Sequence, residues 1–196
     1  MNALSHVCLS LVFKKAIEAR LPVKLPTISF IKGNLKPDFS LLVVKVPHYK
    51  IPTSDIVKRE VDKLMQYMAD HDSFRAGEFA ERLGVITHYL ADFFCYAHST
   101  RFTGSLYDHV VYERNLSRYR KAMKARILES AVHAARLDPG MDCRSICERI
   151  DKLYFQYCSL KPSYAHDLFY TLRAGIPLAV ALISSCPRPE ERKIAA

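Results

Sequence analysis

The sequence predicts an all-α fold, with one compact multi-helix domain over residues 1–190 and a short tail over 191–196. Apolar residues recur with a period near 3.6 through most of the chain, and the alternating pattern of a half-buried strand is almost absent. The 10 prolines lie mostly between these periodic segments, and only 6 of the 196 residues are glycine. A chain of this length can bury one substantial core.

The first part of the chain is predicted to contain one long helix and an irregular connection. The helix is expected over 2–20, where the apolar residues follow the helical period. The next stretch, 21–39, contains three prolines and a glycine, and it is expected to be a loop with a short helical piece. The segment LLVVKV (41–46) could form a strand in isolation, but no partner strand is apparent and Pro47 follows it.

The rest of the chain is predicted to be helical. Five further helices are expected, over 54–69, 73–97, 105–137, 143–159 and 163–185. Thr53 or Ser54 could cap the first of them, because a side-chain oxygen there accepts a hydrogen bond from a backbone N–H. Asp138-Pro139-Gly140 ends the long helix that precedes it. The chain is therefore predicted to fold as a bundle of roughly six or seven helices.

The charge balance narrows the class of partner. The formal net charge of +9 favours anionic partners such as phosphate esters, nucleic acid or acidic lipid surfaces. The densest basic stretch, RNLSRYRKAMKAR (114–126), spreads its charges around a helix, so a solvated surface is the simpler interpretation. No apolar run reaches the roughly 18 residues that span a bilayer. The best candidate, Ile176 to Ile183, is short and contains Pro177, so we expect it in the core and expect no transmembrane segment.

The amino-terminal segment and the cysteines bear on the cellular compartment. The segment ALSHVCLSLVF resembles the core of a signal peptide, but no basic residue precedes it and no small-x-small cleavage site follows it. We therefore expect it to be the first helix of a cytoplasmic protein. The six cysteines include no CxxC pair, so reduced thiols are expected rather than disulfides or a structural zinc site.

The stretch 88–113 concentrates side chains that can bind metal. His88 and Asp92 are four residues apart, His109 and Glu113 repeat this spacing, and His98 lies between the two pairs. A spacing of four places an imidazole and a carboxylate on one helix face, within reach of one ion. Along a straight helix His98 would lie about 15 Å from His88, so it belongs either to a second metal or to a chain that has turned.

This window therefore predicts two sites, His88/Asp92 and His98/His109/Glu113, of which the second has the composition of a catalytic zinc site. The first pair is too small a ligand set, so further ligands are expected from earlier in the chain. Three candidates are Asp38 after Pro37, His48 after Pro47, and His6 on the apolar face of the first helix, although a lone histidine in such a helix is more often a core residue.

In order and spacing, these residues resemble the zinc-dependent phospholipase C and single-strand-specific nuclease superfamily. The family order is an N-terminal residue, His, Asp, His, HxxxD, His six residues later, and HxxxE or HxxxD. The matching positions in this chain are Met1, His6, Asp38, His48, His88, Asp92, His98, His109 and Glu113. The opening MNALSH is also similar to the start of the nuclease branch, where a tryptophan precedes the histidine by five residues.

The resemblance implies an all-α fold that holds three zinc ions. One ion would be bound by Asp38, His48, His88 and Asp92. Asp92 would bridge to another ion, completed by His6 and by the terminal amine and carbonyl of Met1. The remaining ion would be bound by His98, His109 and Glu113. Asp38 is also the implied catalytic residue, which would orient or deprotonate the attacking water.

The implied activity is hydrolysis of a phosphodiester, with three alternatives. A phospholipase C is favoured by the spacing in HYLADFFCYAH, by Glu113 in the last position and by the short chain. Its substrate would be a glycerophospholipid, with peripheral membrane contact, and its products diacylglycerol and a phosphorylated head group. A single-strand-specific nuclease or nucleotidase is favoured by MNALSH and the positive charge, and aromatic residues could stack bases. The third alternative is a non-catalytic metal-binding helical module, and no substrate-binding residue is assigned.

Overall fold

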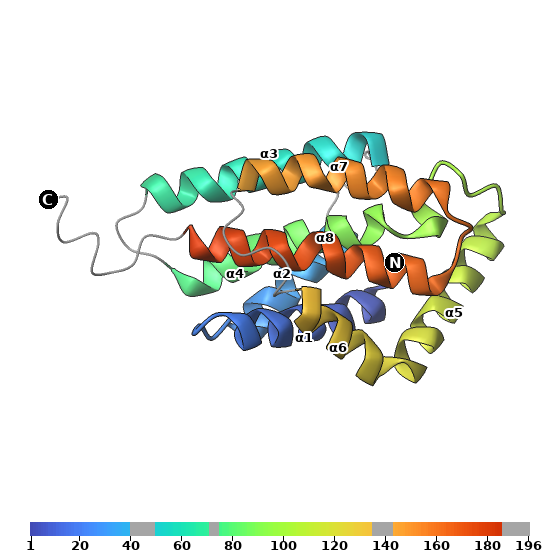
Figure 1. Cartoon of the computed structure of the whole chain (residues 1–196), viewed down its shortest axis with the longest axis horizontal. Helices are drawn as coiled ribbons and strands as arrows, with labels where there is room; N and C mark the ends of the chain where they lie inside the picture. The colour runs from blue at the N-terminus through green and yellow to red at the C-terminus, as the bar shows by residue number, and fades with distance from the viewer. Residues whose placement is uncertain (40–49, 71–74, 135–142, 186–196) are drawn as a thin grey trace, which may run out of the picture.

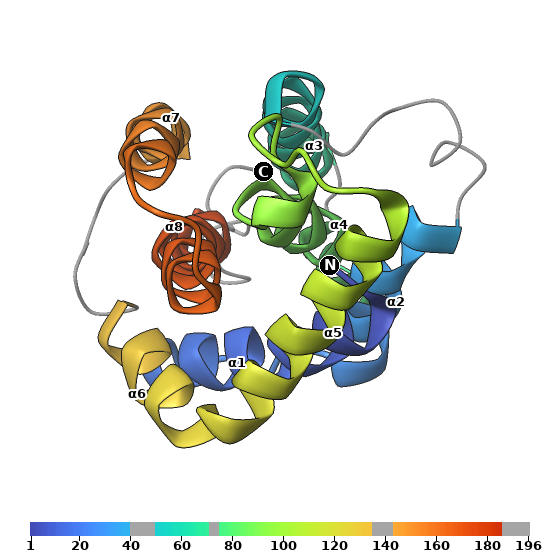
Figure 2. The ribbon, with the colours of Figure 1, turned by 90° about the vertical axis from the view of Figure 1, so that its right-hand side faces the viewer.

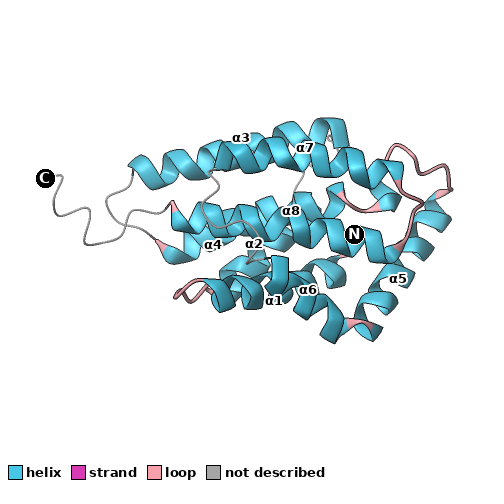
Figure 3. Cartoon of the chain, in the orientation of Figure 1, coloured by secondary structure: helices cyan, strands magenta, loops and turns pink. Residues whose placement is uncertain are grey.

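The computed structural model describes residues 1–39, 50–70, 75–134 and 143–185. These residues form eight α-helices and one short 3-10 turn. No strand is present among them, and Figure 3 shows only helices and loops in the described part of the chain. The prediction of an all-α fold is confirmed. The expected strand at 41–46, the predicted ligand His48 and the tail at 191–196 lie outside the described residues.

The helices form three layers, with one further helix across an end of the molecule (Figures 1 and 2). In chain order they are α1 (Ala3–Arg20), α2 (Thr27–Phe39), α3 (Lys50–Asp70), α4 (Ala76–Phe93), the 3-10 turn η2 (Tyr96–His98), α5 (Leu106–Ala122), α6 (Lys124–Ala134), α7 (Cys143–Ser159) and α8 (Tyr164–Ser184). Helices α4 and α8 form the middle layer, between α3 and α7 on one side and α1, α2 and α6 on the other. Helix α5 crosses the end of the bundle.

Side-chain caps fix the starts of three helices. The side chain of Asn2 accepts a hydrogen bond from the N–H of Ser5 at 2.9 Å at the start of α1. Helix α5 begins with a capping box, in which Ser105 and Asp108 bond each other's backbone N–H groups. Ser163 caps α8 in a similar way. The caps of α1 and α5 set the helical register of the predicted ligands in these helices.

Helix α2 differs from the loop that the sequence predicted over most of this stretch. It is a 13-residue helix in which Pro37 lies in the last turn, where a proline removes only one backbone hydrogen bond. Its glycine is needed for packing rather than for a turn. A Cβ atom on Gly33 would lie 2.0 Å from the backbone oxygen of Glu81 in α4. Gly84, on α4, likewise leaves no room for a Cβ atom next to the backbone of α2, so the two helix backbones approach closely.

The helix expected over 73–97 ends early, at Phe93. The chain then turns through η2, where the N–H of Cys95 donates to the carbonyl of Asp92 at 3.0 Å and the N–H of His98 donates to the carbonyl of Cys95 at 2.9 Å. The sequence left open whether the chain turns before His98. It does turn, and Nδ1 of His98 thereby lies 3.8 Å from Oδ2 of Asp92.

The long helix expected over 105–137 is divided at Met123 into α5 and α6. Met123 leaves the helical conformation with φ −99° and ψ 16°. No proline or glycine marks this bend, which lets α6 pack against α1 and α8 while α5 packs on η2 and α8. Local sequence therefore gave no signal for it.

Helix α8 is the most apolar helix of the described residues. It has the length and composition of a membrane span, which the sequence analysis did not expect, yet 72% of its apolar window is buried inside the structure. A buried core helix passes the same test, so this composition is weak support for a membrane span. Its position in the middle layer agrees with the predicted burial of Ile176 to Ile183, of which all but the last residue are buried.

The contact between α2 and α4 yields a stability prediction. Gly33→Ala would force a methyl group against the backbone of α4, so we expect a loss of about 1–3 kcal/mol in the free energy of unfolding, measured by urea denaturation. Gly77→Ala is the control, because its Cβ would lie 3.3 Å from the side-chain oxygen of Ser29. It should change stability by no more than about 1 kcal/mol. Equal stability of the two variants would contradict the close helix contact.

Candidate metal centre

Asp92 lies at the centre of the predicted metal site, in the last turn of α4, and its side chain is fully buried. Its Oδ1 atom contacts the amino group of Met1 and lies 3.2 Å from Nε2 of His6. Its Oδ2 atom lies 3.3 Å from Nε2 of His88 and 3.8 Å from Nδ1 of His98. One carboxylate therefore faces nitrogen atoms from α1, α4, η2 and the first residue of the chain.

The first cluster of possible ligands surrounds this carboxylate. It consists of His6, Asp38, His88 and Asp92, whose ligand atoms all lie within 4.8 Å of one another. Asp38, on α2, is the partly exposed member, and its Oδ1 atom lies 3.7 Å from Nε2 of His88. The rings of His6 and His88 are stacked, with centroids 3.9 Å apart. Of the predicted ligands for this part of the site, only His48 has no described position.

The orientation of His88 is set by a residue that the sequence analysis missed. Nδ1 of His88 lies 2.7 Å from the backbone oxygen of Asn34, and because a carbonyl only accepts, Nδ1 donates and Nε2 is directed to the carboxylates. The buried side chain of Asn34 in turn accepts a hydrogen bond from the hydroxyl of Thr87 at 3.2 Å. Histidines that bind metal commonly have such a partner on the other nitrogen. The sequence feature that could have indicated this role is the position of Asn34, one helical turn before the predicted ligand Asp38.

The second cluster consists of His98, His109 and Glu113, which the described structure also brings together. Oε1 of Glu113 lies 2.8 Å from Nε2 of His98 and 3.2 Å from Nε2 of His109. All three side chains are half-buried, in contrast to the fully buried His6 and Asp92 of the first cluster. Partial exposure is what an ion with an open coordination position would require.

The amino group of Met1 lies between the two clusters. It contacts Asp92, lies 2.9 Å from Nε2 of His98 and lies 3.3 Å from Oε1 of Glu113. The resemblance placed this amine with His6, and the structure also brings it close to His98 and Glu113 of the second cluster. Burial lowers the pKa of the amine, but the charges of Asp92 and Glu113 outweigh this effect and raise it to about 11. The protonated amine therefore supplies positive charge to both clusters.

At His6, Asp92 and Glu113 the electrostatics favour the protonation states that metal binding needs, whereas the Met1 amine has to lose a proton to bind an ion. Burial and the neighbouring His88 lower the pKa of His6 to about 3, so its ring is neutral. Burial raises the pKa of Asp92, but the nearby His98 and Met1 amine hold it well below its ordinary value. Burial opposes ionisation of Glu113 as well, yet the hydrogen bond from His98 and the Met1 amine lower its pKa to about 2. Both carboxylates are therefore anionic at neutral pH.

These residues fit zinc by their chemistry. Imidazole nitrogens and carboxylate oxygens are zinc ligands. Both ring nitrogens of His6 are buried, and neither has a hydrogen-bond partner of good geometry within the part of the chain that the structure describes, although Nε2 lies 3.2 Å from Oδ1 of Asp92. A buried polar atom without such a partner costs about 1–3 kcal/mol, and coordination of Nε2 to an ion beside Asp92 would remove much of that cost.

A second feature that the sequence analysis missed is a buried carboxylate behind the clusters. Asp167, in the first turn of α8, accepts hydrogen bonds from the hydroxyl of Tyr157 at 2.8 Å, the hydroxyl of Tyr112 at 3.0 Å and the N–H of Tyr96 at 3.2 Å. Tyr96 lies in η2 with His98, and Tyr112 directly precedes Glu113. Asp167 therefore connects α8 to both segments that carry the second cluster.

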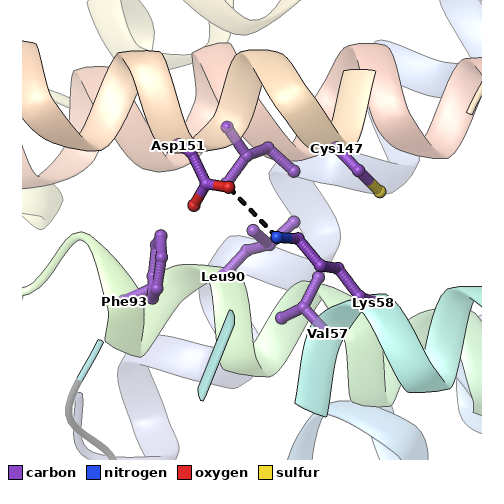
Figure 4. Close-up of a pocket in the computed structure, with 7 residues that line it drawn as sticks. Val57, Lys58, Leu90, Phe93, Cys147 and Asp151 are labelled. Atoms are coloured by element: carbon purple, nitrogen blue, oxygen red, sulfur yellow. Dashed lines mark hydrogen bonds and ion pairs between the residues drawn. The ribbon is translucent and has the colours of Figure 1, made fainter. Parts of the chain in front are cut away.

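Two cavities lie near α4, and they differ in character. A cavity of about 10 Å³ lies between α3, α4 and α7, where Lys58 and Asp151 form an ion pair of 3.1 Å (Figure 4). None of the predicted ligands lines this cavity. A hollow of about 780 Å³ lies between α2, α3 and α4 and includes Pro37 and Tyr89, the chain neighbours of Asp38 and His88. Five basic and three acidic side chains line this hollow, and three of the basic ones, Lys36, Lys63 and Arg82, form ion pairs with the acidic ones.

Comparison with known families agrees with this geometry. The sequence model of the family described as zinc dependent phospholipase C matches residues 4–164. This range is most of the chain and includes every predicted ligand except Met1, so the chain belongs to the zinc-dependent phospholipase C family. Membership supports a zinc phospholipase-type hydrolase. No curated protein and no solved structure matches the chain.

The Asp167 network yields a prediction about stability and pH. Burial raises the pKa of Asp167 from 3.8 to about 6, against the hydrogen bonds from Tyr157, Tyr96 and Tyr112. Between these values the folded state keeps a proton that the unfolded state releases, so this group's contribution to stability falls as pH rises, by up to about 3 kcal/mol. Asp167→Asn removes this dependence. Between pH 4 and about pH 6.5, the free energy of unfolding of the variant should therefore rise relative to that of the wild type.

The control for this prediction is Asp108→Asn. Hydrogen bonds from Ser105 lower the pKa of the exposed Asp108 below its ordinary value of 3.8, so its contribution to stability is nearly constant between pH 4 and about pH 6.5 and is lost only at lower pH. Urea denaturation of the three proteins over the same pH range compares the slopes. A difference between wild type and Asp167→Asn that does not change with pH would contradict the network as described.

Proposed function

We propose that this protein is a zinc-dependent phosphodiesterase of the phospholipase C type, which hydrolyses the glycerol–phosphate bond of a glycerophospholipid to diacylglycerol and a phosphorylated head group. The observation that carries the proposal is the pair of clusters that meet at Asp92 in a chain of this family. A phosphodiester is the substrate class that such paired metal sites suit.

The proposed ligand set follows the clusters, with three zinc ions. One ion would be held by Asp38, His88 and Asp92, with His48 as a further ligand. Asp92 would bridge to an ion bound by His6 and the amine and carbonyl of Met1. The third would be held by His98, His109 and Glu113. The position of the Met1 amine between Asp92, His98 and Glu113 supports its role as a ligand once it is deprotonated.

In the proposed hydrolysis, zinc and the side chains of the protein have different roles. Zinc in such a site supplies a water with a pKa near 7 and positive charge that offsets the charge of the phosphodiester. Asp38 is the partly exposed carboxylate of the first cluster and lies on its solvent side, where it can orient the attacking water and accept its proton. The half-buried His109 lies at the edge of the second cluster, where the substrate's leaving oxygen can approach.

A single-strand-specific nuclease or nucleotidase is the second candidate. The net charge of +9 favours a polyanion, and Tyr107 is 76% exposed two residues before His109, where it could stack on a base. Release of diacylglycerol from phosphatidylcholine, compared with release of nucleotides from single-stranded DNA, separates the two activities.

The zinc-dependent reaction is tested by removal of one ligand. Asp92→Asn should lower kcat/KM for the preferred substrate by more than about 100-fold, because a carboxylate that would hold the zinc ions is lost. Asp151→Asn is the control, since it removes a carboxylate of α7 that pairs with Lys58 at 3.1 Å and is not a predicted ligand. A chelator should abolish wild-type activity and zinc should restore it. Full activity of Asp92→Asn would contradict the proposed site, and a wild-type protein that hydrolyses neither substrate would leave the non-catalytic module as the remaining alternative.

The role of Asp38 is tested by separating zinc content from rate. If Asp38 handles the proton of the attacking water in addition to binding zinc, Asp38→Asn should keep its zinc, because the other ligands and the amide oxygen remain, while kcat falls by about 100-fold or more and KM changes little. Zinc content is measured on the same preparation by elemental analysis. Loss of zinc in parallel with activity would assign Asp38 as a ligand only, and unchanged kcat would remove it from the catalytic step.

A further inference from the structure

Helix α5 carries an exposed apolar surface at its first turns. Leu106 is 81% exposed, Tyr107 76% and Val110 56%. Three large apolar side chains within two turns of one helix form a contiguous patch, and such patches mark interaction sites more often than single exposed residues do. Figure 2 shows that α5 lies at the front of this end of the molecule, with its outer side uncovered by the other described helices.

This patch adjoins the second cluster. With about 100° of rotation per residue, Leu106 and Val110 lie roughly 60° and 100° around the helix from His109, on the same side. Glu113 lies about 40° from His109 and faces His98 across the cluster. The ligand face and the apolar face of α5 are therefore neighbours, and a surface that contacts Leu106 and Val110 comes close to the edge of the metal centre.

Basic side chains continue the same face of α5 toward its end. Arg114, Arg118 and Lys121 are exposed and lie within roughly 80° of Val110 around the helix. The next helix adds the exposed Lys124 and Arg126. The acidic residues of α5 are elsewhere, because Asp108 lies on the opposite side of the ligand face and Glu113 faces the cluster. The outer face of α5 is thus apolar beside the site and cationic beyond it.

We propose that this face of α5, defined by Leu106, Tyr107, Val110, Arg114, Arg118 and Lys121, docks on a phospholipid bilayer that contains anionic lipids. The apolar turns enter the interface, and the basic residues lie against the anionic head groups. Docking places the second cluster next to the head-group layer, where the phosphodiester is. This inference rests on the proposed phospholipase function, because it names the surface from which that enzyme takes its substrate.

The test compares membrane binding with hydrolysis of a dissolved substrate. Binding is measured by cosedimentation of the zinc-loaded protein with phosphatidylcholine vesicles, with and without phosphatidylglycerol. Leu106→Ser/Val110→Ser should lower vesicle binding and hydrolysis of bilayer lipid by about tenfold or more, because two apolar anchors are lost. Hydrolysis of a short-chain phosphatidylcholine below its micelle concentration should stay within about twofold of wild type. Phe155→Ser is the control, since Phe155 is 79% exposed but lies on α7.

The basic part of the face is tested separately. Arg118→Gln/Lys121→Gln should weaken binding to vesicles with phosphatidylglycerol and should reduce the salt dependence of binding, because fewer charges meet the anionic surface. Lys152→Gln/Lys161→Gln, which removes two exposed lysines elsewhere, should bind as wild type does. An equal loss in the control variants, or a loss of dissolved-substrate hydrolysis in Leu106→Ser/Val110→Ser, would overturn the docking face.

Two further outcomes separate docking from the proposed reaction. Wild-type protein that hydrolyses the dissolved lipid but does not bind vesicles would overturn docking while the phospholipase activity stands. Wild-type protein that binds vesicles through α5 but hydrolyses neither form of lipid would contradict the proposed function, and docking would stand by itself. Binding of single-stranded DNA in place of vesicles, lost in the α5 variants, would assign the face to nucleic acid and overturn the lipid proposal.

Discussion

The carboxylate of Asp92 is the constraint on which the arrangement of this protein depends. A fully buried charge costs several kcal/mol unless other groups compensate it, and Asp92 is completely enclosed. The Met1 amine, His6, His88 and His98 all face its two oxygens. The start of α1, the end of α4 and the turn η2 must therefore converge on one point, and a bound cation between these groups would compensate the same charge.

The features that the sequence predicted are those that local spacing determines. His88 and Asp92, and likewise His109 and Glu113, lie together because four residues make about one helical turn, and the family resemblance supplied His6 and Asp38. Asn34 and Asp167 were missed because their importance arises from contacts with segments distant in the chain. The full length of helix α2 and the bend at Met123 were also missed, and the turn before His98 was left open, since tertiary packing overrides the local signals there. The predicted position of His48 stays untested.

The two clusters differ in a way that suits a division of roles. The first has a fully buried interior, with His88 oriented by Asn34, and only Asp38 reaches toward solvent. The second is half-buried and is held in place by α5 and η2, which Asp167 connects to α8. A rigid, enclosed site is suited to holding ions, and a partly open one to admitting substrate. Helix α5 joins the open cluster to the outer surface of the molecule.

The zinc content of untagged protein that starts at Met1 with a free amine tests the central claim most directly. Elemental analysis of protein purified without chelator should find three zinc ions per chain, with one fewer in a version extended before Met1, because the extension removes the amine as a ligand. A folded protein that contains no zinc, and takes up none when zinc is added, would contradict the account of a metal centre around Asp92.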